Sequence, residues 1–223
     1  MKKALLPTFA ALGILALVAA FVFVYVTAKN ADSDTASSTS SSGSQQLAST
    51  VASDSNYVDN VGPEAVTIVE FLDFECGACG QFYPYVEAMR EVYDGDINYV
   101  VRYFPLPSHL NSMDAAVAAE AAAQQGEFEA MYQRLFETQA DWAGGTPPQT
   151  DAFRALAEDI GLDMAAYDDA VADPATQERV EADFDAGVEL GVTSTPTFFV
   201  NDEYIETSRL ENLPEAVDAA VKG

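Results

Sequence analysis

The residues most able to do chemistry are two cysteines in the segment Cys76-Gly77-Ala78-Cys79. If a helix begins at Cys76, its free backbone N–H groups and its dipole stabilise the Cys76 thiolate. The three-residue step then puts Cys79 on the same face of the helix. Cys76 would act as the nucleophile, and Cys79 would resolve any mixed disulfide formed on it. The spacing therefore predicts a redox pair.

Two other uses of this cysteine pair are weaker. A structural zinc site takes about four Cys or His ligands, whereas the chain contains two Cys and one His. A purely structural disulfide would close a loop too short to constrain the unfolded chain much. We therefore expect no metal site and no cofactor.

Hydrophobic period, turn signals and caps predict an α/β fold around the cysteines. The expected elements, in order, are a buried strand at 65–74, a helix at 76–93, a strand at 97–104, helices from about 112 to 190, a hairpin of strands at 197–200 and 204–207, and a helix at 209–222. The helices between 112 and 190 are expected from Thr150, Asp163 and Asp173-Pro174 as starts and from glycines as ends.

This order of elements, with the cysteine pair and the segment Gly191 to Val200, resembles a DsbA-like thiol-disulfide oxidoreductase. The resemblance covers about residues 65–223. It implies a thioredoxin-like fold with an all-helical insertion between the second and third core strands. It also implies that Pro196, after Thr195, is a cis proline beside the redox pair, where the two residues bind the substrate. A trans proline at the first residue of a strand is the alternative.

Glu70 lies inside the first buried strand, where a charge is expected to be used or paired. The resemblance implies that Glu70 relays the proton of Cys79 through water. The alternative is an ion pair with Arg90 or Arg102. The nearby Asp73 and Glu75 are expected to be solvated charges at the end of the strand.

Several other residues are expected to be structural. His109, the single histidine, follows two prolines and is expected in a loop or helix cap. Four aromatic residues are expected in the helical core, namely Phe128, Tyr132, Phe136 and Trp142, although Trp142 could instead line a peptide groove.

The direction of catalysis stays open at this point. Strongly oxidising members of the family often carry a histidine just before the second cysteine, whereas Gly77 and Ala78 carry no charge. The leading hypothesis is an oxidase that donates its disulfide to unfolded exported proteins and is reoxidised by a quinone-linked membrane partner. The alternatives are a reductase or isomerase kept reduced by a membrane electron carrier, and a non-catalytic module that binds exported proteins.

The charge of the chain excludes two classes of partner. The net charge is −26, and nearly all of it lies after residue 56. Such a surface repels phosphates and anionic lipid headgroups, so neither nucleic-acid binding nor peripheral attachment to a charged membrane is expected.

The N-terminal part is expected to lie outside the folded domain at 57–223. Residues 1–29 carry a long uncharged stretch behind Lys2 and Lys3, which predicts a single-pass membrane anchor with the N-terminus in the cytoplasm and the domain outside. The alternative is a cleaved signal peptide, with small residues at 26–28, and a secreted domain. Residues 30–56 contain ten serines and no Lys or Arg, and are expected to be a disordered linker.

Overall fold

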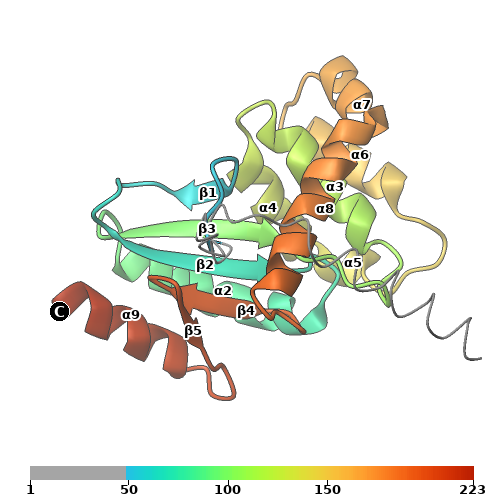
Figure 1. Cartoon of the computed structure of the whole chain (residues 1–223). Coiled ribbons are helices and arrows are strands. Elements are labelled where there is room, and N and C mark those ends of the chain that lie inside the picture. Colours follow the sequence, from blue (N-terminus) through green and yellow to red (C-terminus); the bar gives the residue numbers. More distant parts are fainter. Residues whose placement is uncertain (1–48) are drawn as a thin grey trace, which may run out of the picture. The chain divides into compact units, whose positions relative to one another are not determined.

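A computed structural model describes residues 49–223 of the chain (Figure 1). The expected anchor at 1–29 and most of the expected linker at 30–56 lie outside the described residues. Within residues 49–223, no helix has both the length and the hydropathy needed to span a bilayer.

One mixed sheet forms the centre of residues 49–223 (Figure 1). Its strands are β1 (Asn56–Asp59), β2 (Val66–Leu72), β3 (Ile97–Tyr103), β4 (Thr197–Val200) and β5 (Glu203–Ile205). Their order across the sheet is β1-β3-β2-β4-β5, with β2 parallel to β3 and every other pair antiparallel. The central position of β2, between β3 and β4, explains why its sequence is almost continuously apolar.

The helices confirm the expected insertion. Their bounds are α2 (Gly77–Val92), α3 (Ser112–Ala123), α4 (Phe128–Glu137), α5 (Gln139–Trp142), α6 (Thr150–Asp159), α7 (Met164–Ala172), α8 (Pro174–Glu189) and α9 (Asn212–Lys222). The helices α3 to α8 all fall between β3 and β4 and gather toward one end of the sheet (Figure 1). The fold is therefore thioredoxin-like, with α2 as the crossover between the parallel strands β2 and β3.

Local capping explains several helix ends within the insertion. The Asp163 carboxylate accepts hydrogen bonds from the N–H groups of Ala165 and Ala166 and so caps α7. Asp173 caps α8 in the same way, with proline in the first turn. The helices α4 and α5 follow each other directly and are separated at Thr138. The Thr138 hydroxyl donates to the Arg134 carbonyl at 2.7 Å, a bond that competes with regular helix continuation.

A buried charge cluster joins the insertion to the sheet. Asp183 of α8 is fully buried, accepts hydrogen bonds from Arg102 of β3 and from the Tyr103 N–H at 3.2 Å, and forms an ion pair with Arg179 at 2.9 Å. Since two guanidinium groups and one backbone donor satisfy one carboxylate, the charge is fully compensated. We call Arg102, Arg179 and Asp183 the insertion cluster.

The start of the domain differs from the expected boundary at residue 57. Thr50 is buried, its hydroxyl bonds to Asp202, and its carbonyl accepts from Arg102 at 2.9 Å. The edge strand β1 then begins at Asn56. These contacts are made by polar groups. The serine-rich composition of residues 30–56 predicted a disordered linker and gave no sign of them.

The last hairpin is tighter than expected. Val200 pairs directly with Glu203, so the turn contains only Asn201 and Asp202, which both have positive φ. Two-residue turns of this kind match the twist of the flanking strands and favour Asn and Asp. As a result β5 covers 203–205 rather than 204–207.

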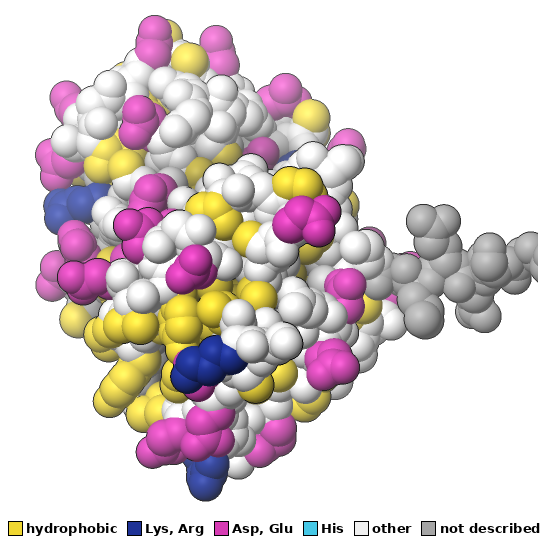
Figure 2. Space-filling view, turned by 90° about the vertical axis from the view of Figure 1, so that its left-hand side faces the viewer, with side chains coloured by type: hydrophobic (Ala, Val, Ile, Leu, Met, Phe, Trp, Pro, Cys, Tyr) yellow, Lys and Arg dark blue, Asp and Glu magenta, His cyan; other side chains and the backbone are white. Residues whose placement is uncertain are grey.

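Acidic side chains are spread over the face of the molecule in Figure 2, where Lys and Arg occur at only a few places. Every Arg and Lys side chain within residues 49–223 is paired with a carboxylate. The described region therefore has a large excess of acidic groups and no unpaired Arg or Lys.

Candidate active site

Cys76 and Cys79 lie at the start of α2, where the sheet meets the insertion. Cys76 is the N-cap residue, and Cys79 lies in the first turn. Cys76 is 8% exposed and Cys79 only 1%, so the two thiols have different access to solvent. Both are free thiols in this structure.

The two thiols have opposite pKa displacements. A hydrogen bond from the Cys79 thiol, together with the N–H groups of Ala78 and Cys79, lowers the pKa of Cys76 to about 5, although burial opposes this. Burial raises the pKa of Cys79 well above its ordinary value. At neutral pH the site therefore holds one thiolate and one thiol.

Thr195 and Pro196 lie against Cys76. The Thr195–Pro196 peptide bond is cis, as the resemblance implied, and it directly precedes β4. The Cys76 sulfur lies 3.5 Å from the Thr195 carbonyl oxygen. The structure thus brings together two segments that are more than a hundred residues apart in the sequence.

Glu70 is buried in the middle of β2, and no Arg or Lys of residues 49–223 pairs with it. The Tyr99 hydroxyl donates a hydrogen bond to its carboxylate. The alternative of an ion pair was wrong, because Arg90 binds three other carboxylates and Arg102 binds Asp183. Burial raises the pKa of Glu70 to about 8, and the bond from Tyr99 offsets this only in part. Glu70 therefore titrates close to neutral pH.

Asp73 is buried, so the expectation of a solvated charge was wrong. Its carboxylate accepts from the N–H groups of Glu75 at 2.8 Å and Leu106 at 2.9 Å, and contacts the His109 ring. Its backbone carbonyl accepts from the Cys76 N–H at 3.0 Å. Asp73 therefore connects the cysteine segment to the loop that follows β3. Burial raises its pKa, against these hydrogen bonds.

Glu75 is also buried, again contrary to expectation. Its carboxylate accepts from the Asn111 N–H at 2.6 Å and from the Gly144 N–H at 2.8 Å. Backbone N–H groups from loops 36 and 69 residues away replace water around this charge. No local sequence pattern could indicate them.

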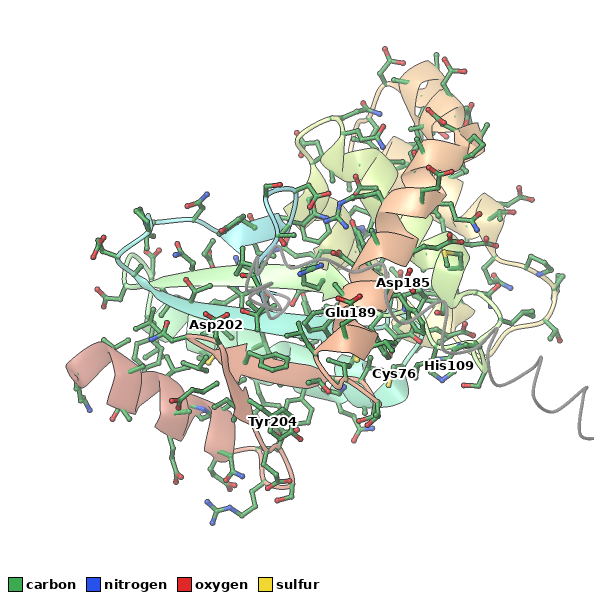
Figure 3. The ribbon with its side chains drawn as sticks, viewed as in Figure 1. Cys76, His109, Asp185, Glu189, Asp202 and Tyr204 are labelled. Carbon is green, nitrogen blue, oxygen red and sulfur yellow. The ribbon has the colours of Figure 1, made fainter. Side chains whose placement is uncertain are left out.

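His109 lies in the loop before α3, as expected, but it also makes a contact that the sequence did not reveal. Its ring Nδ1 is 2.6 Å from an Asp73 carboxylate oxygen. Burial opposes charging of the ring, but the bond to Asp73 and the negative charges of Asp73 and Cys76 raise the pKa of His109. Figure 3 shows Cys76 and His109 at the same end of the sheet.

The aromatic residues expected in the core are buried, which confirms that expectation for Phe128, Tyr132, Phe136 and Trp142. The Trp142 indole N–H donates to the Leu135 carbonyl at 3.1 Å, so this side chain packs inside the insertion instead of lining a peptide groove. Within residues 49–223, no cluster of three or more His, Cys, Asp or Glu side chains is arranged to hold a metal ion.

Comparison with known proteins gives one family and a set of related structures. A family model described as Thioredoxin matches residues 63–219. A thioredoxin-like oxidoreductase from Silicibacter pomeroyi is 28% identical, with a TM-score of 0.62 over 77% of this chain and 95% of that one. BdbD from Bacillus subtilis is 23% identical, with a TM-score of 0.65 over 73% and 91%. MdbA, a thiol-disulfide oxidoreductase from Corynebacterium diphtheriae, is 21% identical, with a TM-score of 0.59 over 71% and 85%.

The curated relatives are much longer proteins. The sequence is 39% identical to the Na(+)/H(+) antiporter NhaA 1 of a Mycobacterium species over 62% of this chain and 22% of the antiporter. It is 34% identical to the NhaA 1 antiporter of Salinispora arenicola over 76% of this chain and 25% of that protein. The chain thus spans about a quarter of the length of the curated relatives it matches.

Proposed function

This chain belongs to the thioredoxin family and is a DsbA-like thiol-disulfide oxidoreductase, and we propose that it donates a disulfide to exported proteins through Cys76 and Cys79. The observation that carries this proposal is the unequal environment of the two sulfurs. Cys76 keeps 8% of its surface exposed, contacts the Thr195 carbonyl and has a pKa of about 5, whereas Cys79 is 1% exposed.

The transfer proceeds in two exchanges. A client thiolate attacks the Cys76 sulfur of the oxidised pair, the S–S bond to Cys79 breaks, and Cys79 leaves and takes a proton. A second client thiolate then attacks the client sulfur of the mixed disulfide and releases Cys76 as a thiolate. The client loses two electrons, which the enzyme gains. The low pKa of Cys76 makes it a good leaving group in the second exchange.

Glu70 supplies and removes the proton of Cys79 in this scheme, acting through water. It is buried, and its negative charge raises the pKa of Cys79, so the two groups are close enough to interact. With a pKa of about 8, Glu70 is present in both protonation states near neutral pH, as an acid–base group requires.

Thr195 and Pro196 form the proposed binding site for the client backbone. Their position against the Cys76 sulfur supports this, because a client segment lying there brings its own sulfur next to Cys76. Neither residue carries a charge, so the site would accept clients of varied sequence.

The pKa of Cys76 favours oxidation over the reductase and isomerase alternatives. A thiolate that is stable at neutral pH stabilises the reduced enzyme, and a couple with a stable reduced form is a strong oxidant. Reoxidation then requires a membrane partner, for which we propose a quinone-linked oxidase. A membrane electron carrier would serve a reductase instead.

We propose that the domain lies outside the cytoplasm. In one form, residues 1–29 are a single-pass membrane anchor; in the alternative form, these residues are cleaved and the domain is secreted. The matches to Na(+)/H(+) antiporters support a location at the membrane, because part of each antiporter sequence is similar to this chain. Release of the domain from washed membranes by outside protease tests the anchored form. A mature N-terminus near residue 29 would instead establish the secreted form.

Two cysteine variants test the proposed roles. We expect Cys76→Ser to abolish disulfide transfer, and Cys79→Ser to accumulate mixed disulfides with clients, because attack still occurs and resolution does not. The adducts are identified by mass spectrometry after acid trapping. Adducts on Cys79 of the Cys76→Ser protein would reverse the assignment.

The reduction potential tests the direction. We expect equilibration with glutathione to give a potential well above that of thioredoxin, about −270 mV. A potential at or below the thioredoxin value would identify a reductase, and absence of any turnover of a dithiol peptide would leave only the binding-module alternative.

A further inference from the structure

The chain places one ionisable ring beside the cysteine segment without any assigned role. His109 comes from the loop after β3, and its Nδ1 lies 2.6 Å from Asp73. Asp73 in turn accepts the Cys76 N–H through its backbone carbonyl at 3.0 Å. Asp73 therefore contacts both the His109 ring and the segment that carries Cys76. Figure 3 shows Cys76 and His109 at the same end of the sheet.

The segment that precedes Cys76 carries two buried acidic residues. Asp73 and Glu75 lie within the adjoining segment and are buried, so water screens them weakly. Buried like charges disfavour a thiolate. All Arg and Lys side chains within residues 49–223 are paired with carboxylates, and His109 is the single histidine of the chain.

The charged side chains that face His109 are all acidic or thiolate groups, which favour the protonated form of its ring. Asp73, Glu75 and Cys76 act on it from the cysteine segment. A cavity of about 340 Å³ is lined by His109 together with Glu181 and Asp185 of α8. Figure 3 shows Asp185 on α8 above the level of Cys76 and His109. No cation faces the ring from these elements.

We propose that the His109 imidazolium, held by Asp73, is the cation that stabilises the Cys76 thiolate and thereby favours the reduced state of the pair. His109 is a positioning residue here, since it acts by its charge and no bond to the sulfur is required. The inference rests on the proposed role of Cys76. It deepens that role by naming the group that compensates the thiolate where Gly77 and Ala78 offer no charge.

The redox consequence follows from the balance of the reaction. Reduction of the pair breaks the S–S bond, takes two electrons from two client thiols, places one proton on Cys79 and leaves Cys76 as a thiolate. A cation beside that thiolate stabilises the product only. A tenfold stabilisation corresponds to about 30 mV of potential for this two-electron couple.

The first test is an ultraviolet titration of the thiolate in the reduced protein. We expect His109→Gln to raise the pKa of Cys76 by about one unit, the effect of losing a nearby cation. His109→Lys should restore the wild-type value, because it keeps the charge. Lys222→Gln, which removes one positive charge at the far end of α9, is the matched control and should leave the titration unchanged.

The second test uses the single histidine as its own probe. The ring resonances of His109 in the untagged protein should give a higher pKa in the reduced state than in the oxidised state. If His109 acts through its charge, this difference should be similar in size to the shift of the Cys76 pKa in His109→Gln.

Three outcomes would overturn the inference. The His109 pKa could be the same in both redox states, Lys at position 109 could fail to restore the Cys76 titration, or Lys222→Gln could shift it equally. Failure of the proposed function is distinct, since a protein without client turnover would still show both linked shifts.

Discussion

Two parts of this molecule bury carboxylates, and they do so in opposite ways. In the insertion cluster, Asp183 is surrounded by Arg102, Arg179 and a backbone N–H. In the active site, Glu70 has the Tyr99 hydroxyl and no cation. The first carboxylate is compensated and joins α8 to the sheet. The second is left poorly compensated and titrates near neutral pH. For these two carboxylates, the cations nearby distinguish an acid that joins two elements from an acid whose pKa is raised by burial.

The largest expected effect concerns the insertion cluster. Asp183→Asn should cost about 3 to 5 kcal/mol of unfolding free energy, because it leaves the buried Arg102 guanidinium without its carboxylate and removes one of the two carboxylates paired with Arg179. Urea unfolding measures this, with the exposed Glu178→Gln on the same helix as control. If Asp183→Asn were as stable as the control, the insertion cluster would not stabilise the fold, and the contrast with Glu70 would not hold.

Glu70 should show the opposite behaviour in a pH series. Its folded pKa of about 8 lies above the unfolded value, so the stability from neutral Glu70 is fully present below about pH 4.5 and is lost as the pH rises through 8. In the oxidised protein, Glu70→Gln should lack this loss and gain up to about 5 kcal/mol over wild type at alkaline pH. Equal pH dependence of the two proteins would show that Glu70 is ionised in the fold.

The kinetic role of Glu70 is the next effect in size. Glu70→Gln should slow the step that moves the proton of Cys79 by about 100-fold, which is typical of a lost acid–base group. Stopped-flow exchange with a dithiol peptide measures it. Glu91→Gln, on the exposed side of α2, serves as the charge-matched control. If both variants reacted at the wild-type rate, Glu70 would be only a buried structural acid.

Salt should have the smallest effect. The surface carries most of the net charge of −26, which raises the pKa of Cys76 through long-range repulsion. Between about 0.01 and 1 M salt this repulsion is screened, so the pKa should fall, but by less than about half a unit. Asp73 and Glu75 contribute little to this change because they are buried. A pKa that rises with salt would mean that attraction by exposed cations dominates at the sulfur.

The sequence predicted those features that local signals encode. The apolar run of β2, the caps of α7 and α8 and the cysteine spacing each lie within a few residues, and together they predicted the fold and the insertion. It missed β1, because a four-residue edge strand of half-buried residues has no clear period.

In the candidate active site, the sequence indicated the residue types that could do chemistry but not the polar contacts around them. The burial of Asp73 and Glu75 depends on N–H groups from distant loops, which leave no pattern beside the carboxylates. His109 was placed correctly in a loop, but its contact with Asp73 arises only when the loop after β3 folds over the cysteine segment.

The position of Trp142 gives the domain an optical property. It is the single tryptophan of the chain, it is 2% exposed, and it stacks edge-on against Phe153. Two residues later, the Gly144 N–H donates to the carboxylate of Glu75, which adjoins Cys76. Tryptophan fluorescence of this protein therefore arises from one site, whose loop is bonded to the cysteine segment. A change in emission on reduction would follow motion of that loop in real time, without any attached label.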